Sequence, residues 1–103
     1  MLIQQGDVLI ESALIPSGAK AKTSSKRGLV LAEGESTGHA HTITSTEDAV
    51  LFENGDDLYL RVLRETKLTH EEHGVVTIPA GEYTVRKVRE YDHFAEEAKP
   101  VQD

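Results

Sequence analysis

Residues 49–63 read Ala49-Val50-Leu51-Phe52-Glu53-Asn54-Gly55-Asp56-Asp57-Leu58-Tyr59-Leu60-Arg61-Val62-Leu63. The dipeptide Asn54-Gly55 favours the type I′ turn that joins two antiparallel strands. The residues before it are apolar, and after it apolar side chains alternate with Tyr59 and Arg61, a pattern typical of a half-buried antiparallel strand. This stretch therefore predicts a β-hairpin.

Further short apolar segments extend the β pattern outward from this hairpin. We expect strands at residues 8–10, 28–32, 38–44, 74–78 and 83–91. The segment 28–32 is apolar throughout, which predicts burial on both faces, and Val88 is out of phase in the last segment, which predicts a bulge near Arg86-Lys87. Residues 16–27 have loop composition. The sequence thus predicts an all-β fold, a small antiparallel barrel or sandwich of about seven short strands.

Composition narrows the chemistry available to these 103 residues. The chain has no cysteine, so a metal site has to use histidine and carboxylate, which suit zinc, manganese, iron or nickel. The net charge of −7 argues against nucleic acid as a partner. The sequence shows neither a signal-peptide pattern nor an apolar run long enough to span a membrane, so we expect a cytoplasmic protein without a membrane partner.

The first histidine motif is Gly38-His39-Ala40-His41. Residues two apart on an extended strand point to the same side, about 6.6 Å apart, so His39 and His41 could converge on one metal ion. From residue 28 to residue 60 there are seven acidic residues and neither Lys nor Arg, and this excess of negative charge favours a cation.

The second motif, His70-Glu71-Glu72-His73, follows about thirty residues later. Residues three apart share one side of a turn or a single helical turn. Position 74 is glycine, so the motif is not the His-Glu-x-x-His of zinc proteases. We predict that His39, His41, His70 and His73 form the ligand pool of a divalent metal ion. Glu71 or Glu72 would be a further ligand, or a general base in metal-assisted chemistry on a small molecule.

Three other interpretations stay open. Paired histidines also occur on solvated strands and loops without any role. They could instead lie at the interface of a homo-oligomeric assembly module, a dimer or trimer, where their charge changes between about pH 5 and 8. Histidines could also act as acid and base without metal, on a phosphate-bearing substrate held by the basic loop at residues 20–27. The chain shows no complete catalytic signature, so the sequence does not decide whether it is an enzyme.

Part of this pattern resembles the cupins, whose first motif has Gly, His-x-His and a later Glu, and whose second has Pro-x-Gly followed by His. Here Gly34 or Gly38, His39-Ala40-His41 and Glu47 are similar to the first motif, and Pro79-Ala80-Gly81 is similar to the second. The resemblance implies a cupin-like or jelly-roll-like fold. Thr84 stands where the second motif has its histidine, so the fourth ligand would have to come from His70 or His73.

A longer resemblance is to a group of small uncharacterised bacterial and phage-type proteins. It is carried by Gly38-His39-Ala40-His41, by Leu68-Thr69-His70-Glu71-Glu72-His73, and by the segments 79–83 and 89–92. This resemblance implies that the two histidine motifs belong together, and it brings no activity with it. We expect one β domain over residues 1–93 and a short flexible polar tail over residues 94–103.

Overall fold

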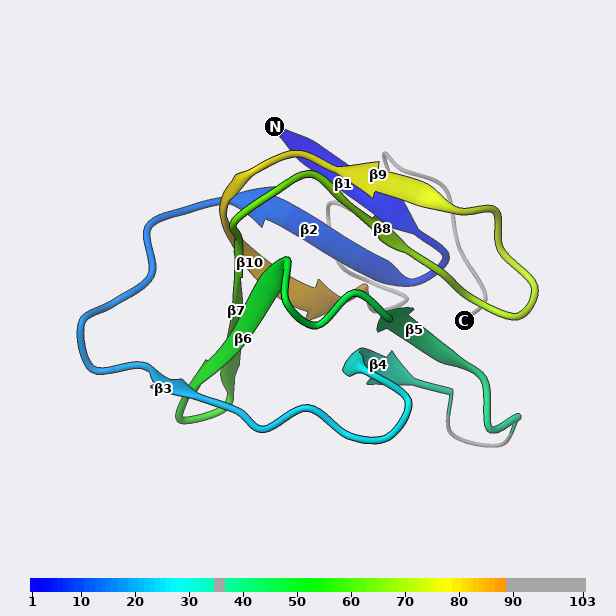
Figure 1. The fold of residues 1–103 in the computed structure, drawn as a ribbon, viewed down its shortest axis with the longest axis horizontal. Coiled ribbons are helices and arrows are strands. Elements are labelled where there is room, and N and C mark those ends of the chain that lie inside the picture. The colour runs from blue at the N-terminus through cyan, green and yellow to red at the C-terminus, as the bar shows by residue number, and fades with distance from the viewer. Residues whose placement is uncertain (35–36, 89–103) are drawn as a thin grey trace.

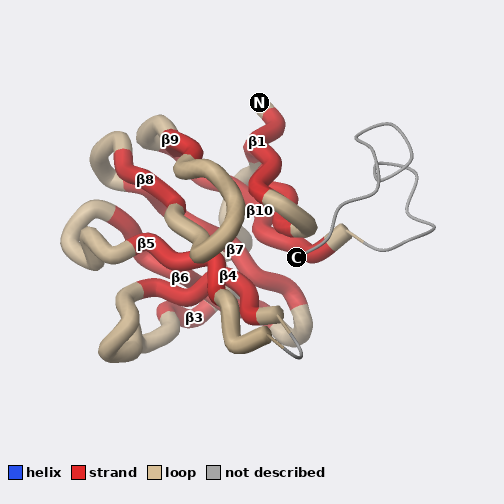
Figure 2. The backbone as a smooth tube through the Cα atoms, turned by 90° about the vertical axis from the view of Figure 1, so that its right-hand side faces the viewer, coloured by secondary structure: helices blue, strands red, loops and turns tan. Residues whose placement is uncertain are grey.

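The computed structural model describes residues 1–34 and 37–88, which form strands, turns and loops. The ten strands are β1 (Leu2–Gln5), β2 (Val8–Ser12), β3 (Lys20–Ala21), β4 (Leu29–Glu33), β5 (Ala40–Ile43), β6 (Ala49–Asn54), β7 (Asp57–Val62), β8 (Thr66–Leu68), β9 (Val76–Ile78) and β10 (Gly81–Lys87). The described residues contain no helix, which confirms the predicted all-β class (Figures 1 and 2). Consequently they contain no helix that is long and apolar enough to cross a membrane.

The strands pair in one large sheet and two small ones, all antiparallel. The large sheet has the order β1-β2-β10-β7-β6-β3, while β4 pairs with β5 and β8 pairs with β9. Because β1 and β3 end the order of the large sheet without pairing to each other, this sheet is not a closed barrel. The small sheets contribute to the same hydrophobic core as the large one, so the fold is layered and open.

The predicted hairpin at the centre of the sequence is confirmed by β6 and β7. Asn54 pairs with Asp57, so the two-residue loop is Gly55-Asp56, one residue later than the Asn54-Gly55 turn that we predicted. Gly55 has a φ of 64°, a left-handed conformation that glycine adopts without steric cost. The turn moves by one residue because Asn54 remains in the hydrogen-bonded ladder.

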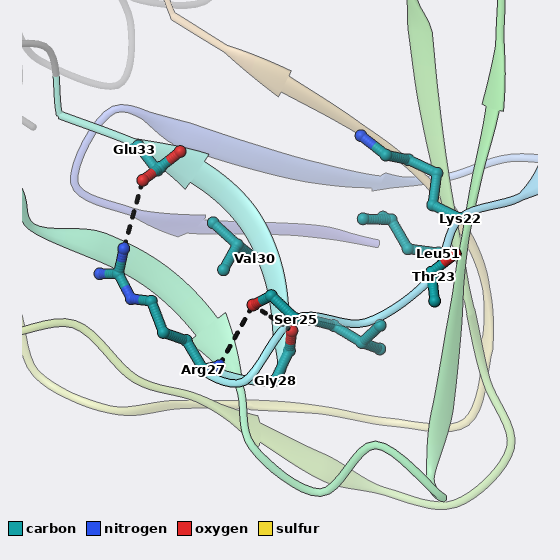
Figure 3. Close-up of a pocket in the computed structure, with 9 residues that line it drawn as sticks. Lys22, Thr23, Ser25, Arg27, Gly28, Val30, Glu33 and Leu51 are labelled. Atoms are coloured by element: carbon teal, nitrogen blue, oxygen red, sulfur yellow. Dashed lines mark hydrogen bonds and ion pairs between the residues drawn. The ribbon is translucent and has the colours of Figure 1, made fainter.

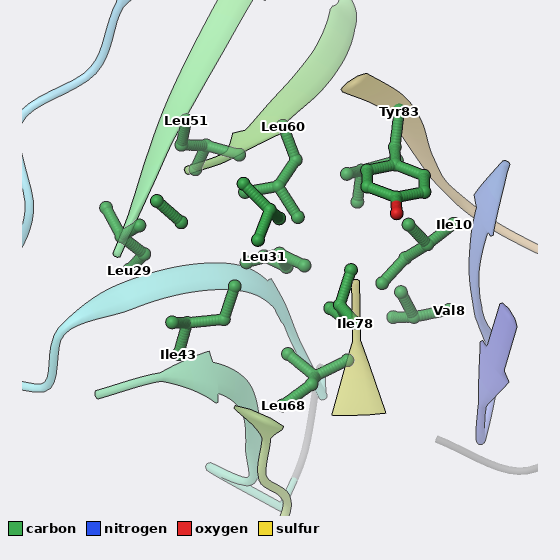
Figure 4. Close-up of a cluster of buried hydrophobic side chains, with 13 residues drawn as sticks. Val8, Ile10, Leu29, Leu31, Ile43, Leu51, Leu60, Leu68, Ile78 and Tyr83 are labelled. Atoms are coloured by element: carbon green, nitrogen blue, oxygen red, sulfur yellow. The ribbon is translucent and has the colours of Figure 1, made fainter. Parts of the chain in front are cut away.

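A single hydrophobic core lies between the large sheet and the small ones (Figure 4). It is built almost entirely from Val, Leu and Ile, and Tyr83 is its only aromatic member among residues 1–34 and 37–88. Tyr83 is 3 % exposed, and its buried hydroxyl donates a hydrogen bond to the carbonyl oxygen of Pro79 at 2.7 Å. The core therefore satisfies its one polar side-chain group.

A backbone bridge joins the two small sheets at Thr42 and Thr69. The N–H of each residue donates to the carbonyl of the other, at 2.9 Å in both directions. The hydroxyl of Thr69 adds a hydrogen bond to the carbonyl of Thr42 at 3.1 Å. Since Thr42 follows His41 and Thr69 precedes His70, this bridge places the two histidine segments side by side.

Several local predictions were wrong. Strands β1, β3 and β8 were not predicted, because β1 carries two glutamines, β3 lies inside the predicted loop 16–27, and β8 is only three residues long. The structure therefore has ten strands instead of about seven. Val30 and Ala32 of β4 are only half-buried, so this strand is not buried on both faces.

The predicted bulge at Arg86-Lys87 was also wrong. β10 pairs with β2 in unbroken register from Tyr83 to Lys87, and the irregularity lies instead between Val30 and Ala32. Residues 89–91 of the predicted last strand, the domain boundary at residue 93 and the tail 94–103 fall outside the described residues.

We predict that Glu82 makes the fold sensitive to acid. Its carboxylate accepts hydrogen bonds from the backbone N–H of Ile15 (3.1 Å) and from Nε of Arg61 (3.0 Å), and these two contacts lower its pKa. A carboxylate whose pKa is lower in the folded state stabilises the fold above its unfolded pKa, and this contribution is lost as the pH falls through the folded pKa. Glu82→Gln should therefore lower the melting temperature at neutral pH and flatten its decline in acid.

Circular dichroism melts over a pH series measure this effect. Glu47→Gln, which changes an exposed turn residue, is the control and should behave as the unmodified protein. An acid decline that is as steep in Glu82→Gln as in the control would contradict the assignment.

Candidate metal centre

The four histidines of the two motifs meet in the structure. Ring centroids are 4.3 Å apart for His41 and His70, 4.5 Å for His70 and His73, 5.4 Å for His39 and His70, and 6.0 Å for His41 and His73. His70 thus contacts the other three rings. The contacts bring the loop before β5 together with the β8–β9 loop, a proximity that the sequence did not establish.

The two motifs reach this cluster from different kinds of backbone. His41 lies within β5 and is 1 % exposed, whereas His39 precedes the strand and its side chain is 25 % exposed. His70 and His73 lie in the bend between β8 and β9, as predicted for a short connection. The cluster therefore has a buried side at His41 and an open side at His39.

Gln5 fixes both the position and the tautomer of His41. The side chain of Gln5 is buried, and its Nε2 donates to the carbonyls of Leu68 and Gly74, both at 2.9 Å. This leaves Oε1 as an acceptor, 2.8 Å from Nδ1 of His41. Nδ1 consequently carries the proton, and Nε2 of the neutral ring presents a lone pair.

Asp7 faces that lone pair. Its Oδ1 lies 3.2 Å from Nε2 of His41, but neither atom has a hydrogen-bond partner among the described residues. Burial, and then the neighbouring His70, lower the pKa of His41, against the opposing effect of Asp7. When the ring is neutral, two buried acceptor atoms, Nε2 of His41 and Oδ1 of Asp7, face each other at 3.2 Å. Each unsatisfied buried polar atom costs about 1–3 kcal/mol.

His70 has the opposite tautomer. Its Nδ1 accepts hydrogen bonds from the backbone N–H groups of Glu72 (3.0 Å) and His73 (3.2 Å). In the neutral ring the proton therefore resides on Nε2. Nε2 is buried and has no hydrogen-bond partner among the described residues. In the neutral rings, Nε2 of His41 therefore has a lone pair, whereas Nε2 of His70 carries a proton.

Possible metal-ligand atoms of His39, His70 and Glu71 form a group at the open side of the cluster. One such atom from each residue lies within 4.8 Å of the others. Of the predicted ligand pool, this group contains two histidines and the first glutamate. His41 and His73 lie outside this group, although their rings contact His70.

The carboxylate of Glu71 is held in place by the strand that carries the first motif. Its Oε1 accepts a hydrogen bond from the backbone N–H of Ala40 at 2.9 Å, and this bond is the main cause of its lowered pKa. Its Oε2 lies 3.7 Å from Nη2 of Arg27. Glu71 is therefore ionised at neutral pH, and its lowered pKa makes it a weak general base.

Arg27 links this centre to two surface pockets. One pocket of about 330 Å³ lies between residues 22–28 and β4. Figure 3 shows Arg27 pointing toward Glu33, and Nη1 of Arg27 donates a hydrogen bond to Oε2 of Glu33 at 3.2 Å. The other pocket, about 320 Å³, opens directly beside His70 and Glu71. Arg27 lines both, so one residue of the predicted basic loop does reach the histidine cluster.

Sequence reasoning missed two residues of this centre, Gln5 and Asp7. Gln5 and Asp7 flank Gly6 in the turn between β1 and β2. The sole signal in the sequence was the pair of polar side chains next to a buried strand. Their contacts with His41 join segments more than thirty residues apart, which no local pattern encodes.

A comparison with protein-family models places the chain in a family. The model of a domain of unknown function (DUF8820) matches residues 4–88, so the chain belongs to this family. This confirms the expectation of an uncharacterised family in general terms, and both histidine motifs lie inside the matched region. The particular motifs and the cupin resemblance stay predictions. Searches of the curated proteins and of the solved structures found no match.

We predict that Gly6 is required for close packing of the cluster. Gly6 has a φ of 56°, and a Cβ atom there would lie 2.5 Å from Nε2 of His73 and 3.2 Å from Cε1 of His41. Gly6→Ala should destabilise the fold by about 1–2 kcal/mol through its left-handed backbone, and additionally displace the His73 ring.

Gly55→Ala is the matched control, because Gly55 has a φ of 64° with no atom within 4 Å of a Cβ. Urea unfolding of both variants, together with the histidine side-chain signals in an NMR spectrum, measures the difference. Equal losses of stability and unchanged histidine signals in Gly6→Ala would contradict the packing described here.

Proposed function

We propose that this domain binds a divalent metal ion at the histidine cluster, with His39, His70 and Glu71 as its ligands. The observation that carries the proposal is the convergence of donor atoms from two separate loops to within 4.8 Å. Imidazole nitrogen and carboxylate oxygen together suit zinc, manganese, iron and nickel. His41 and His73 contact His70 and complete the pool of candidate ligands.

Unpartnered nitrogen atoms favour this function over solvated histidines without a role. Nδ1 of His39 and Nε2 of His70 are buried and lack hydrogen-bond partners among the described residues. Buried polar atoms without partners are uncommon in folded proteins, and each needs an explanation. A metal ion bound between the two rings would supply one.

Binding at His70 requires a local change. A neutral imidazole that coordinates through Nε2 carries its proton on Nδ1, yet Nδ1 of His70 accepts two backbone hydrogen bonds here. The metal therefore has to move this proton, and the bonds from Glu72 and His73 must break. We expect the bend at residues 70–73 to rearrange on binding.

Chemistry on a small molecule is a further step that the geometry supports less directly. The pocket of about 320 Å³ beside His70 offers space next to the proposed metal. Glu71 is engaged by Ala40 and Arg27, whereas the side chain of Glu72 is 64 % exposed. Oε1 of Glu72 lies 3.6 Å from Nδ1 of His39, so Glu72 is the first residue to test as a general base beside the proposed metal.

We predict that the untagged protein binds Zn²⁺ near stoichiometrically, and that His39→Ala and Glu71→Gln each weaken binding by at least about tenfold. Isothermal titration calorimetry with metal-free protein measures the affinity. Glu53→Gln is the control, because Glu53 is likewise an exposed carboxylate with a basic neighbour, Lys22, at 3.9 Å. Failure of the unmodified protein to bind Zn²⁺, Mn²⁺, Fe²⁺ or Ni²⁺ would end the proposal.

The alternative of a homo-oligomeric assembly module makes a different prediction. Its melting temperature would depend on protein concentration and pH and would not respond to a chelator or to added metal. Metal binding predicts instead a melting temperature that is independent of protein concentration and falls when a chelator is added, since a ligand that binds only the folded state raises the melting temperature as the ligand concentration rises.

A further inference from the structure

We infer that Asp7 and His41 form a second cation position, in which a divalent metal ion lies between Oδ1 of Asp7 and Nε2 of His41. This inference goes beyond the proposed function because it uses neither His39 nor Glu71. Asp7 is 8 % exposed and His41 is 1 % exposed, so the position lies on the buried side of the cluster. The two facing atoms lie 3.2 Å apart, and neither has a further hydrogen-bond partner among the described residues.

The tautomer of His41 is set for this role. A histidine that binds a metal through one nitrogen usually donates the N–H of the other to a carbonyl or carboxylate, which fixes the ring and raises its basicity. Here Nδ1–H of His41 donates to Oε1 of Gln5 at 2.8 Å. Gln5 is thus a positioning residue, because its own amide is held by the carbonyls of Leu68 and Gly74.

The spacing of the two atoms fits a shared metal ion. Nitrogen and oxygen ligands lie about 2.0–2.2 Å from zinc, so two of them are roughly 2.8–3.6 Å apart at angles between square and tetrahedral. The observed separation of Asp7 Oδ1 and His41 Nε2 is 3.2 Å. The structure therefore brings these ligand atoms to the required distance before any ion is bound.

The second oxygen of Asp7 is oriented away from this position. Oδ2 lies 3.5 Å from Nζ of Lys87, which leaves Oδ1 directed at His41. The competing explanation is that a proton bridges the two atoms, giving an imidazolium–carboxylate ion pair. The two explanations differ in what happens when the charge of Asp7 is removed.

The variant Asp7→Asn distinguishes the metal ion from the bridging proton. Asp56→Asn, in the exposed β6–β7 loop, is the matched control. The amide of an asparagine can donate to the lone pair on His41 Nε2, so the metal account predicts an apo melting temperature that is unchanged or higher. It also predicts a loss of Zn²⁺ affinity at this position of at least about tenfold. The probe is Zn²⁺ added to metal-free, full-length protein, followed by calorimetry and thermal melts.

A lower apo melting temperature with unchanged Zn²⁺ binding would overturn the inference in favour of the proton-bridged pair. The same titration on His39→Ala distinguishes a failure of this inference from a failure of the proposed function. Binding that survives Asp7→Asn but not His39→Ala overturns only the second position, whereas the opposite result supports it and overturns the first. Absence of Zn²⁺ binding in the unmodified protein overturns both.

Discussion

The histidine cluster depends on the hydrogen bonds of one buried side-chain amide, that of Gln5. Its two donors hold the carbonyls of Leu68 and Gly74, at either end of the loop that carries the second motif, and its oxygen holds the ring of His41 from the first. One buried group thereby joins β1, β5 and the β8–β9 loop. Because the amide accepts from Nδ1 of His41, it also determines which nitrogen of that ring is available to a ligand.

The core and the cluster occupy different parts of the fold. The core is made of aliphatic side chains packed between the sheets, while the cluster lies where the β1–β2 turn and the β8–β9 loop meet the start of β5 (Figure 1). Turns on a rigid scaffold are common positions for binding residues. The bridge between Thr42 and Thr69 connects the two parts, since it adds backbone order directly beside His41 and His70.

Sequence patterns predicted the parts of the structure that depend on local order. Alternation of apolar side chains revealed the β6–β7 hairpin, and the spacing of histidines revealed the members of the cluster. Patterns did not reveal β8, which is three residues long, or the roles of Gln5 and Asp7. These depend on contacts between distant segments. A glutamine beside a glycine is typical of any turn, so the sequence does not indicate which distant residue the glutamine contacts.

The most direct test of the account is a long-range ¹H–¹⁵N correlation spectrum of the histidine side chains, recorded without metal and with added Zn²⁺. The account predicts that metal-free His41 carries its proton on Nδ1 and His70 on Nε2, and that Zn²⁺ shifts the ring nitrogens of both. A spectrum in which His41 is protonated on both nitrogens, and in which Zn²⁺ changes no histidine signal, would contradict it.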